Sequence, residues 1–478
     1  MSRARPGRNR TGRVGRVGGV TETSATTTGP SPERIAELAE RVRAEMPAVR
    51  DDLETLSRIP SVSLDSFDQR HVDDSAEAVA DLLRAEGMQV RIVREGGRPA
   101  VIGHLDGPPG APTVLLYAHH DVQPPGDDAD WSTPPFEPTE VDGRLYGRGV
   151  ADDKAGVMAH VAALRAHDGK PPVGVTVFVE GEEEVGSASL ETILEKHATE
   201  LQADAIVLAD STNWKIGVPA LTTTLRGLVR VVVEVTALEH GVHSGMYGGA
   251  VPDGLTALCR LLATLHDDEG NVAVAGLKSS DAPDLDYSEE DLRADAGLAE
   301  GVQPIGSGSI LSRLWTRPSM TVIGIDAPSV AKAANLLTPV GRAKLSMRIH
   351  PEEDPQTAYE LLKRHLEDHA PWGCRVSVTL DDQGAGFAAK ADGPIYEQAR
   401  AAFRDAWGTD PVDIGVGGSI PFIAAFAEHY PDAAILVTGV EDPDSRAHAA
   451  NESLHLGEFE RACVAEAVLL ERLGTTGR

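Results

Sequence analysis

The sequence of 478 residues has few cysteines, few aromatic residues and a deficit of positive charge. Its three cysteines, Cys259, Cys374 and Cys463, are far apart and odd in number, which argues against a disulfide scaffold or a CxxC zinc site. This cysteine usage is typical of a reducing compartment, so we expect a cytoplasmic location. No apolar run approaches the ~20 residues that a bilayer crossing needs, so we predict no membrane partner.

Acidic residues outnumber basic ones by 74 to 44, and the net charge of −30 disfavours nucleic acids and anionic membrane surfaces as partners. With 41% hydrophobic and 25% charged residues, the chain is otherwise ordinary for a globular protein. Positive charge is concentrated at the beginning, where residues 1–20 hold six arginines and no acid. A Thr/Ser/Gly-rich stretch follows, and we interpret residues 1–30 as a disordered Arg-rich tail and linker without the apolar core of a secretion signal.

Short apolar runs alternate with helical patterns over much of the chain. A helix is predicted to begin at Ser31-Pro32, with the serine as N-cap, and further helical patterns occur at 74–86, 154–167, 187–197 and 456–473. The apolar runs predict buried strands at Thr113–Ala118, Val173–Val179, Ala205–Ala209 and Ala433–Thr438. Buried strands that alternate with helices indicate an α/β catalytic domain with a mainly parallel sheet flanked by helices.

The stretch from residue 217 to residue 385 has a different pattern. It combines strand-like and helical segments with a polar, acidic stretch that predicts loops: strands at 229–235, 342–349 and 375–380, helices at 253–266 and 355–366, and loops at 269–304. We interpret it as an inserted α+β domain. The predicted organisation is therefore a catalytic domain in two parts, 31–216 and 386–478, interrupted by the insertion at 217–385.

Histidines and carboxylates gather where the predicted strands end. The clusters are His119–Asp121, Asp152 with Asp153, Glu180–Glu184, Asp210, and His448 with Asn451 and Glu452. Open α/β sheets bind ligands at the carboxyl ends of their strands, so the clusters would converge on one cleft. Each cluster alone has a simpler explanation, since a His-x-Asp pair is often a solvated turn, adjacent glutamates often form a charged surface, and Asp-Asp-Lys caps a helix well.

Taken together, the clusters indicate a metal site. Several carboxylates in one place repel each other unless cations occupy the site. Imidazole and carboxylate ligands suit zinc or manganese, and two ions can share a bridging carboxylate and an activated water. His119 and Asp121 are spaced by two on a strand end and so point the same way, whereas His120 points to the opposite face. No GxSxG motif or partnered cysteine supports a serine or thiol nucleophile.

The order and spacing of these motifs resemble the M20 metallopeptidases, the clan-MH enzymes with two co-catalytic metal ions, and most closely their carnosinase-like dipeptidase branch. The resemblance runs from Ser31 to the C-terminus, and the Asp-Val-Gln-Pro form of the first motif points to the dipeptidase branch. The motifs that carry it are Tyr117–Pro124, Trp131, Pro134–Phe136, Leu145–Gly149, Asp152–Lys154, Glu180–Ser187, His243–Gly245, Gly417–Pro421 and Ala447–Glu452.

The resemblance implies a set of metal ligands. Asp152 would bridge two divalent metal ions in each subunit. His119 and Asp210 would complete the binding of one ion, and Glu184 and His448 that of the other. The ions would be Zn²⁺, with Mn²⁺ or Co²⁺ as alternatives, because sites of histidine and carboxylate accept all three.

Three further expectations concern residues beside these ligands. Glu183 would be the general base, and Asp121 would be the acid that orients His119 and raises its basicity. Glu182 would be a surface residue. The Asp152–Asp153 peptide bond is expected to be cis.

The resemblance also implies that substrate is bound from the inserted domain. His243 would reach the cleft of a partner subunit and polarise the scissile carbonyl oxygen, which would require a homodimer through residues 217–385. Arg348 would bind the substrate's terminal carboxylate with its planar guanidinium group, and Ser419 would add a further contact. Without the resemblance, His243 is a loop histidine and Arg348 a solvated charge on a strand.

The predicted function is hydrolysis of the amide bond of dipeptides or similar small peptides. One alternative stays within the same chemistry, as an N-acyl amino acid amidohydrolase or a carboxypeptidase, because substrate choice depends on the shape of the cleft. A second alternative is a non-enzymatic binding protein on the same fold. That alternative predicts the loss of a ligand or of the base, whereas all five ligands and Glu183 are present.

Overall fold

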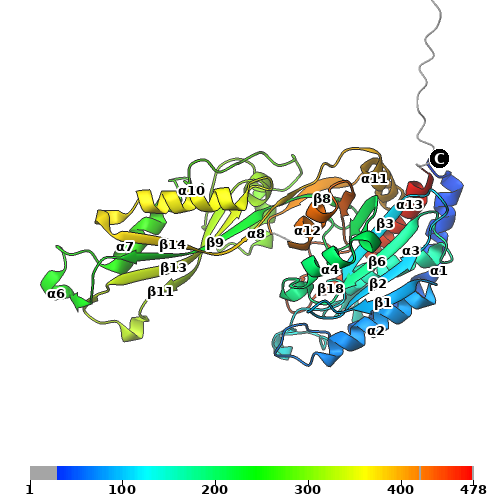
Figure 1. Cartoon of the computed structure of the whole chain (residues 1–478), viewed down its shortest axis with the longest axis horizontal. Helices are drawn as coiled ribbons and strands as arrows, with labels where there is room; N and C mark the ends of the chain where they lie inside the picture. Colours follow the sequence, from blue (N-terminus) through cyan, green and yellow to red (C-terminus); the bar gives the residue numbers. More distant parts are fainter. Residues whose placement is uncertain (1–28, 419–420, 476–478) are drawn as a thin grey trace, which may run out of the picture.

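The larger of two lobes is built around a nine-stranded sheet (Figure 1). The computed structural model describes residues 29–418 and 421–475. Eight strands of this sheet lie in the order β1 (Gln89–Val93), β2 (Ala100–Leu105), β6 (Gly174–Glu180), β3 (Thr113–His119), β7 (Ala205–Leu208), β17 (Ala434–Val437), β8 (Ala220–Leu225) and β15 (Phe387–Ala388), and β16 (Val412–Val416) pairs with β8. The four central strands, β6, β3, β7 and β17, are mutually parallel. The predicted α/β class with a mainly parallel sheet is confirmed.

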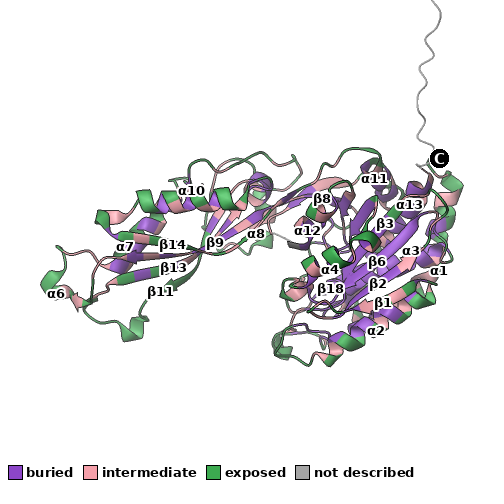
Figure 2. Cartoon of the chain, in the orientation of Figure 1, coloured by how far each residue is buried: buried purple, intermediate pink, exposed green. Residues whose placement is uncertain are grey.

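Helices cover both faces of this sheet, because successive residues of a strand point to opposite sides. In β3, Val114 and Leu116 pack into one hydrophobic core, and Leu115 and Tyr117 pack into another. The first core contains α1 (Pro32–Ser57), α2 (Arg70–Ala85), α3 (Lys154–Ala166), α11 (Pro394–Trp407) and α13 (Leu456–Thr475). The second contains α4 (Leu190–Lys196), α5 (Ala198–Leu201) and α12 (Pro421–His429). Figure 2 shows the buried residues concentrated in this sheet and its helices.

The smaller lobe contains a second, antiparallel sheet in the order β11 (Ser319–Asp326), β13 (Val340–Ile349), β9 (Gly227–Thr236) and β14 (Arg375–Gly384). Alternate residues of β9 are buried, as expected for a sheet with one covered face. Apolar residues of α7 (Gly254–Leu262) and α10 (Pro355–Asp368) pack with the sheet's buried residues in a third core. The edge strand β11 leaves Val322, Ile323 and Ile325 exposed.

Shorter elements complete the chain. A three-stranded sheet joins β18 (Ser453–His455), β5 (Arg144–Tyr146) and β4 (Thr139–Val141). The others are η1 (Asp128–Asp130), η2 (Glu183–Val185), β10 (Val242–His243), α6 (Ser244–Tyr247), η3 (Ala263–Leu265), α8 (Glu289–Asp295), α9 (Ile310–Trp315), η4 (Val330–Lys332), β12 (Leu336–Leu337) and η5 (Pro371–Gly373). Within the described ranges, the helices are either too short or too polar to cross a membrane.

The change from the first sheet to the second occurs at Arg226. Strand β8 still pairs in the larger sheet and β9 begins the smaller one, so the sheets divide about ten residues after the expected start of the insertion at residue 217. Arg226 joins both lobes: its Nε donates to the carbonyl oxygen of Gly417 at 3.1 Å, and its Nη1 donates to Ser319 Oγ at 3.1 Å. The stretch 269–304, expected to be loops, contains the short helix α8, which Ser288 caps.

Candidate active site

Four parallel strands and one helix bring the chemically active side chains together. Strand β3 ends at His119, Glu183 and Glu184 lie on η2 after β6, and Asp210 follows β7 by two residues. His448 lies in the loop between β17 and β18, and Asp152 precedes α3. The convergence follows from the parallel arrangement, which places the carboxyl ends of these strands at one edge of the sheet.

Five of these side chains form two groups of potential metal ligands that share Asp152. In the first group, His119 Nε2 is 3.0 Å from Asp152 Oδ1 and 3.8 Å from Asp210 Oδ2. In the second group, His448 Nε2 is 3.0 Å from Asp152 Oδ2 and 3.2 Å from Glu184 Oε2. Each oxygen of Asp152 thus faces a different histidine, which is the arrangement that a bridging carboxylate requires.

The hydrogen bonds of His119 indicate a positive charge between these side chains. Its Nδ1 lies 3.1 Å from the backbone carbonyl oxygen of Asp121, a group that only accepts, so Nδ1 carries a proton. The neutral ring then presents a lone pair at Nε2 toward the carboxylates of Asp152 and Asp210. Lone pairs facing lone pairs repel, and either a second proton or a metal ion between them removes the repulsion. The donor set therefore fits a divalent cation.

Asp121 holds the loop that carries the two glutamates. Its buried carboxylate accepts hydrogen bonds from the backbone N–H of Glu183 at 3.2 Å and of Glu184 at 3.1 Å, and it lies 3.5 Å from His119 Nδ1. The nearer partner of His119 is the backbone carbonyl of Asp121 rather than this carboxylate. Asp121 therefore positions η2 as well as the histidine.

Gln123 fixes the side chain of Glu184. Its backbone N–H donates to Glu184 Oε1 at 3.0 Å, and its side-chain Nε2 donates to Oε2 at 2.7 Å. Sequence reasoning used Gln123 only as part of the Asp-Val-Gln-Pro motif and missed this contact. A glutamine two residues after a candidate acid is no signal by itself, because its partner is 61 residues away in the chain.

Carboxyl groups are crowded at this site, and their pKa values reflect it. Burial and the charge of Asp210 raise the pKa of Glu183 well above its ordinary value, and burial with the charge of Asp152 raises that of Glu184. Burial raises the pKa of Asp210 to about 7, although His119 opposes the shift. Without cations, the group therefore resists carrying its full negative charge.

The pKa shifts of Asp152 and His448 both favour the charged form, because the two side chains pair with each other. Burial works to raise the pKa of Asp152, but hydrogen bonds from His119 and His448 lower it overall. Hydrogen bonds to Asp152 and Glu184 raise the pKa of His448 to about 11. Glu441, which sequence reasoning missed, belongs to the same group, since burial and the charges of Asp152 and Asp210 raise its pKa well above normal.

The backbone around the site is unusual in two places. The Asp152–Asp153 peptide bond is cis, as expected. Arg446, His448 and Asn451 have positive φ angles of 55°, 63° and 64°, which side chains other than glycine seldom adopt. Asn451 is held there by two hydrogen bonds, in which its Oδ1 accepts from Ser132 N–H and its Nδ2 donates to the carbonyl of Asp130.

The neighbours His120 and Glu182 point away from the two ligand groups. His120 is buried, and its Nε2 donates to the carbonyl oxygen of Pro99 at 2.9 Å, on the other side of the strand from His119. The expectation of a surface position for Glu182 is wrong. Its side chain is buried and accepts hydrogen bonds from the backbone N–H groups of Arg98 and Ser189. It therefore links the backbone of two segments instead of facing solvent.

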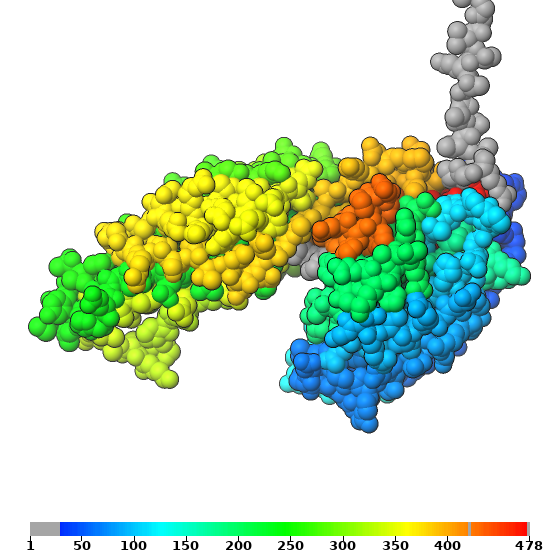
Figure 3. All heavy atoms as spheres, in the orientation of Figure 1, coloured from blue at the N-terminus to red at the C-terminus, as the bar shows by residue number. Residues whose placement is uncertain are grey.

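Of the residues expected to bind substrate, His243 and Arg348 lie on strands of the smaller lobe and belong to neither ligand group. His243 precedes α6, which lies at the far tip of the smaller lobe in Figure 1, and its Nδ1 accepts from the N–H of Gly245. Arg348 lies on β13, where it pairs with Leu228 at the end of the sheet nearest the larger lobe. Ser419 lies outside the described residues. Figure 3 shows an open notch between the lobes on the face in view.

Comparisons with known proteins agree with this geometry. Residues 115–472 match the model of peptidase family M20/M25/M40. The chain is 35% identical over 384 residues to a cysteinylglycine-S-conjugate dipeptidase of Corynebacterium striatum, covering 78% of this chain and 84% of that protein. It is 28% identical over 440 residues to the Cys-Gly metallodipeptidase DUG1 of Saccharomyces cerevisiae, covering 84% and 90%.

A solved structure agrees over nearly the whole length. The crystal structure of human carnosine dipeptidase 1 superimposes with a TM-score of 0.74 at 25% sequence identity, covering 94% of this chain and 100% of that chain. The match to the family model and the likeness to the dipeptidase of C. striatum extend over most of the sequence. The chain therefore belongs to peptidase family M20/M25/M40.

Proposed function

We propose that this protein is a metal-dependent dipeptidase, which hydrolyses the amide bond of dipeptides or similar small peptides with an activated water. The observation that carries the proposal is the pair of ligand groups that share Asp152, with the carboxyl group of Glu183 beside them. The relatives named as dipeptidases support the substrate class.

Two divalent metal ions would be held by the two groups. His119, Asp152 and Asp210 would hold one, and Asp152, Glu184 and His448 the other. Histidine nitrogen and carboxylate oxygen are ligands that zinc prefers, and manganese and cobalt are the alternatives. When bound, such ions would acidify a water and offset the charge of the clustered carboxylates.

The protein's own side chains would then carry the protons. Glu183, on the rigid turn that Asp121 holds, would take a proton from the attacking water and return it to the departing nitrogen. Asp121 would keep Nδ1 of His119 protonated through its backbone carbonyl, which leaves Nε2 free as a ligand. Asp121 is fully buried, which limits competition from bulk water for the hydrogen bonds that hold this turn.

Arg348 would bind the substrate's carboxylate. It lies on β13 between the buried residues Met347 and Ile349, so it points to the uncovered face of the sheet, opposite the helices. A guanidinium group matches a carboxylate in two parallel hydrogen bonds. We assign Ser419 to the same subsite on the strength of the sequence resemblance alone.

His243 would act in the cleft of a partner subunit, because α6 is at the tip of the lobe, remote from its own chain's site (Figure 1). There its imidazole would donate a hydrogen bond to the carbonyl oxygen of the scissile bond. The dimer would form through the smaller lobe. The exposed apolar residues Val322, Ile323 and Ile325 on the edge strand β11 support this, since an unpaired strand edge is a ready site for pairing with a second chain.

Removing the metal should destabilise the protein. Dialysis against a chelator leaves the clustered carboxylates without counter-charge, and the melting temperature should fall. Binding of each ion at 100 times its Kd contributes about 2.7 kcal/mol to the stability of the folded state. Differential scanning calorimetry before dialysis, after it and after addition of Zn²⁺ measures the effect. An unchanged melting temperature, although elemental analysis shows that dialysis removed the metal, would contradict the assignment of the ligands.

A substrate panel tests the reaction itself. Dipeptides should be hydrolysed faster by metal-loaded protein than tripeptides or N-acyl amino acids, and dipeptide amides, which lack the carboxylate that Arg348 binds, should show a raised KM. Preference for N-acyl amino acids would instead establish the alternative of an amidohydrolase in the same family. If metal-loaded, dimeric protein hydrolysed none of these amides, the proposal would be wrong.

The unpaired cysteines are compatible with a cytoplasmic location, which we include in the proposal.

A further inference from the structure

Glu452 receives hydrogen bonds from four groups of one short segment. The segment is the loop that leads to Asp152. Oε1 accepts from the backbone N–H groups of Ala151 at 3.0 Å and of Asp152 itself at 3.2 Å. Oε2 accepts from Gly149 N–H at 3.1 Å and from the guanidinium Nη1 of Arg148 at 2.7 Å. The mechanism above makes no use of this carboxylate, although it lies four residues after His448.

Arg148 extends the same network to two other loops. Its Nη2 donates to the backbone carbonyl oxygen of Ala449 at 3.1 Å and to that of Pro124 at 3.4 Å. Its guanidinium carbon lies 5.5 Å from the centre of the Trp131 ring, which covers it. The pair therefore connects the loop of Asp121 and Gln123, the loop of Asp152 and the loop of His448.

The pair is deeply buried, with 1% of Arg148 and none of Glu452 exposed. Moving two charges out of water costs several kcal/mol per ion, and an apolar pair of similar size is often as stable. Stability alone therefore does not account for a charged pair here. A carboxylate with all its acceptor positions occupied does one thing that an apolar side chain cannot, which is to hold three backbone N–H groups in a fixed direction.

We propose that Glu452 and Arg148 form a positioning pair, which sets the direction of Asp152 and its separation from His448 so that the two ligand groups can share one carboxylate. The inference rests on the proposed function, because it concerns where the metal ligands lie. Within the described part of the chain, their hydrogen bonds join them to each other and to backbone groups, so both act through the backbone that carries Asp152 and His448. Loss of the pair should weaken metal binding before it affects the binding of substrate.

Glu452→Gln in the full-length protein tests the proposal. The amide keeps the shape but replaces one acceptor oxygen with a donor, which would face backbone N–H groups. Titration of the metal-free variant with Zn²⁺ should show about 10- to 100-fold weaker binding, the range found when a partner of a metal ligand is removed. The absorption spectrum of the Co²⁺-loaded variant should differ from that of the wild type. At saturating metal, kcat should fall while KM for a dipeptide stays the same.

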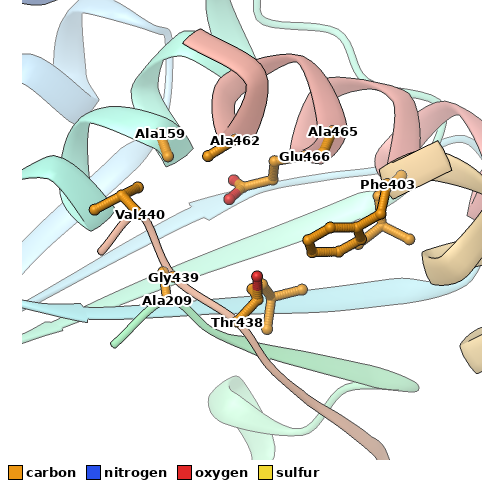
Figure 4. A pocket seen from close by; sticks show the side chains of 11 residues that line it. Ala159, Ala209, Phe403, Thr438, Gly439, Val440, Ala462, Ala465 and Glu466 are labelled. Atoms are coloured by element: carbon orange, nitrogen blue, oxygen red, sulfur yellow. The ribbon is translucent and has the colours of Figure 1, made fainter. Parts of the chain in front are cut away.

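Glu466→Gln is the matched control. Glu466 Oε1 is 2.8 Å from Nδ1 of the buried His160, a pair that joins α13 to α3 beside a small cavity of about 30 Å³ (Figure 4). Figure 4 shows the Glu466 side chain directed into that cavity, among Ala159, Ala462 and Val440. Its loss should lower the melting temperature and leave the Zn²⁺ affinity and the Co²⁺ spectrum unchanged.

Four outcomes would overturn the inference or separate it from the proposed function. Wild-type Zn²⁺ affinity and an unchanged Co²⁺ spectrum in Glu452→Gln would overturn it. So would an equal loss of affinity in Glu466→Gln, which would show a general loss of stability. If Glu452→Gln does not fold, Arg148→Lys keeps the charge but loses the bonds to Ala449 and Pro124, and it should weaken Zn²⁺ binding to a smaller extent; wild-type affinity there would also count against the pair. Wild-type protein that binds no metal would instead refute the proposed function.

Discussion

Replacing Glu183 with alanine should abolish dipeptide hydrolysis while the protein keeps about two metal ions per chain. Glu183 lies beside Glu184 on η2 but belongs to neither group of ligands, and its backbone N–H is held by Asp121. A positioned base contributes about 10²- to 10⁴-fold to the rate, so kcat should fall by that factor and added substrate should not restore it. Steady-state kinetics gives the rate, and elemental analysis of the purified variant gives the metal content.

The neighbouring glutamate supplies the control. Glu182→Ala removes a side chain of the same kind one residue earlier, but that side chain binds the backbone of Arg98 and Ser189 on the far side of the turn. This variant should melt at a lower temperature and retain its turnover per bound metal. A Glu183→Ala protein that loses both ions would show that Glu183 is a ligand and that the base has been misassigned.

Mixing two inactive variants should restore activity if His243 acts across the dimer. In a dimer of one His243→Ala chain and one Glu183→Ala chain, the first chain has an intact Glu183 and receives His243 from its partner. The other site lacks both. Random exchange of subunits makes about half of the dimers mixed, each with one intact site of two, so the mixture should regain about a quarter of the wild-type rate. The rate should rise with time as the subunits exchange.

A double variant excludes a trivial rescue. Glu183→Ala mixed with a chain that carries both Glu183→Ala and His243→Ala has no intact base in any combination, so it should stay inactive. If the first mixture stays inactive although exchange is confirmed by mass spectrometry of the dimers, then His243 does not serve the partner's site. Activity of His243→Ala alone near that of the wild type would show that His243 has no part in the reaction.

Much of the larger lobe could be predicted, because its pattern is local. A strand buried on both faces is a continuous apolar run, as in β6, where all seven residues are buried, and such a run is visible in the sequence. The start of α1 was equally clear, since the Ser31 side chain accepts from Arg34 N–H and Pro32 follows it. Strands β1 and β8 were missed because neither is a continuous apolar run: Arg91 interrupts β1, and threonines occupy residues 222–224 of β8.

The site divides in the same way. The candidate ligands could be named because histidines and acids follow the predicted strands directly in the sequence. A parallel sheet places the carboxyl ends of its strands at one edge, which brings these side chains together. The contacts of Glu182 and Glu452 could not be predicted, because each carboxylate binds backbone N–H groups. Almost every residue has a backbone N–H group, so the residue types do not reveal which one is bound. A hydrogen bond between residues that are 300 positions apart depends on the finished fold.

The order of the ligands along the chain has a consequence for how the protein is made. Asp152 is synthesised early, but His448 follows it by nearly 300 residues, after the whole smaller lobe, and α13 must pack against α1 and α3 to complete the first core. A ribosome-bound chain therefore holds at most one of the two ligand groups until His448 emerges. If both groups are needed, we expect the chain to stay inactive during its own synthesis, and a chain truncated before His448 to remain inactive.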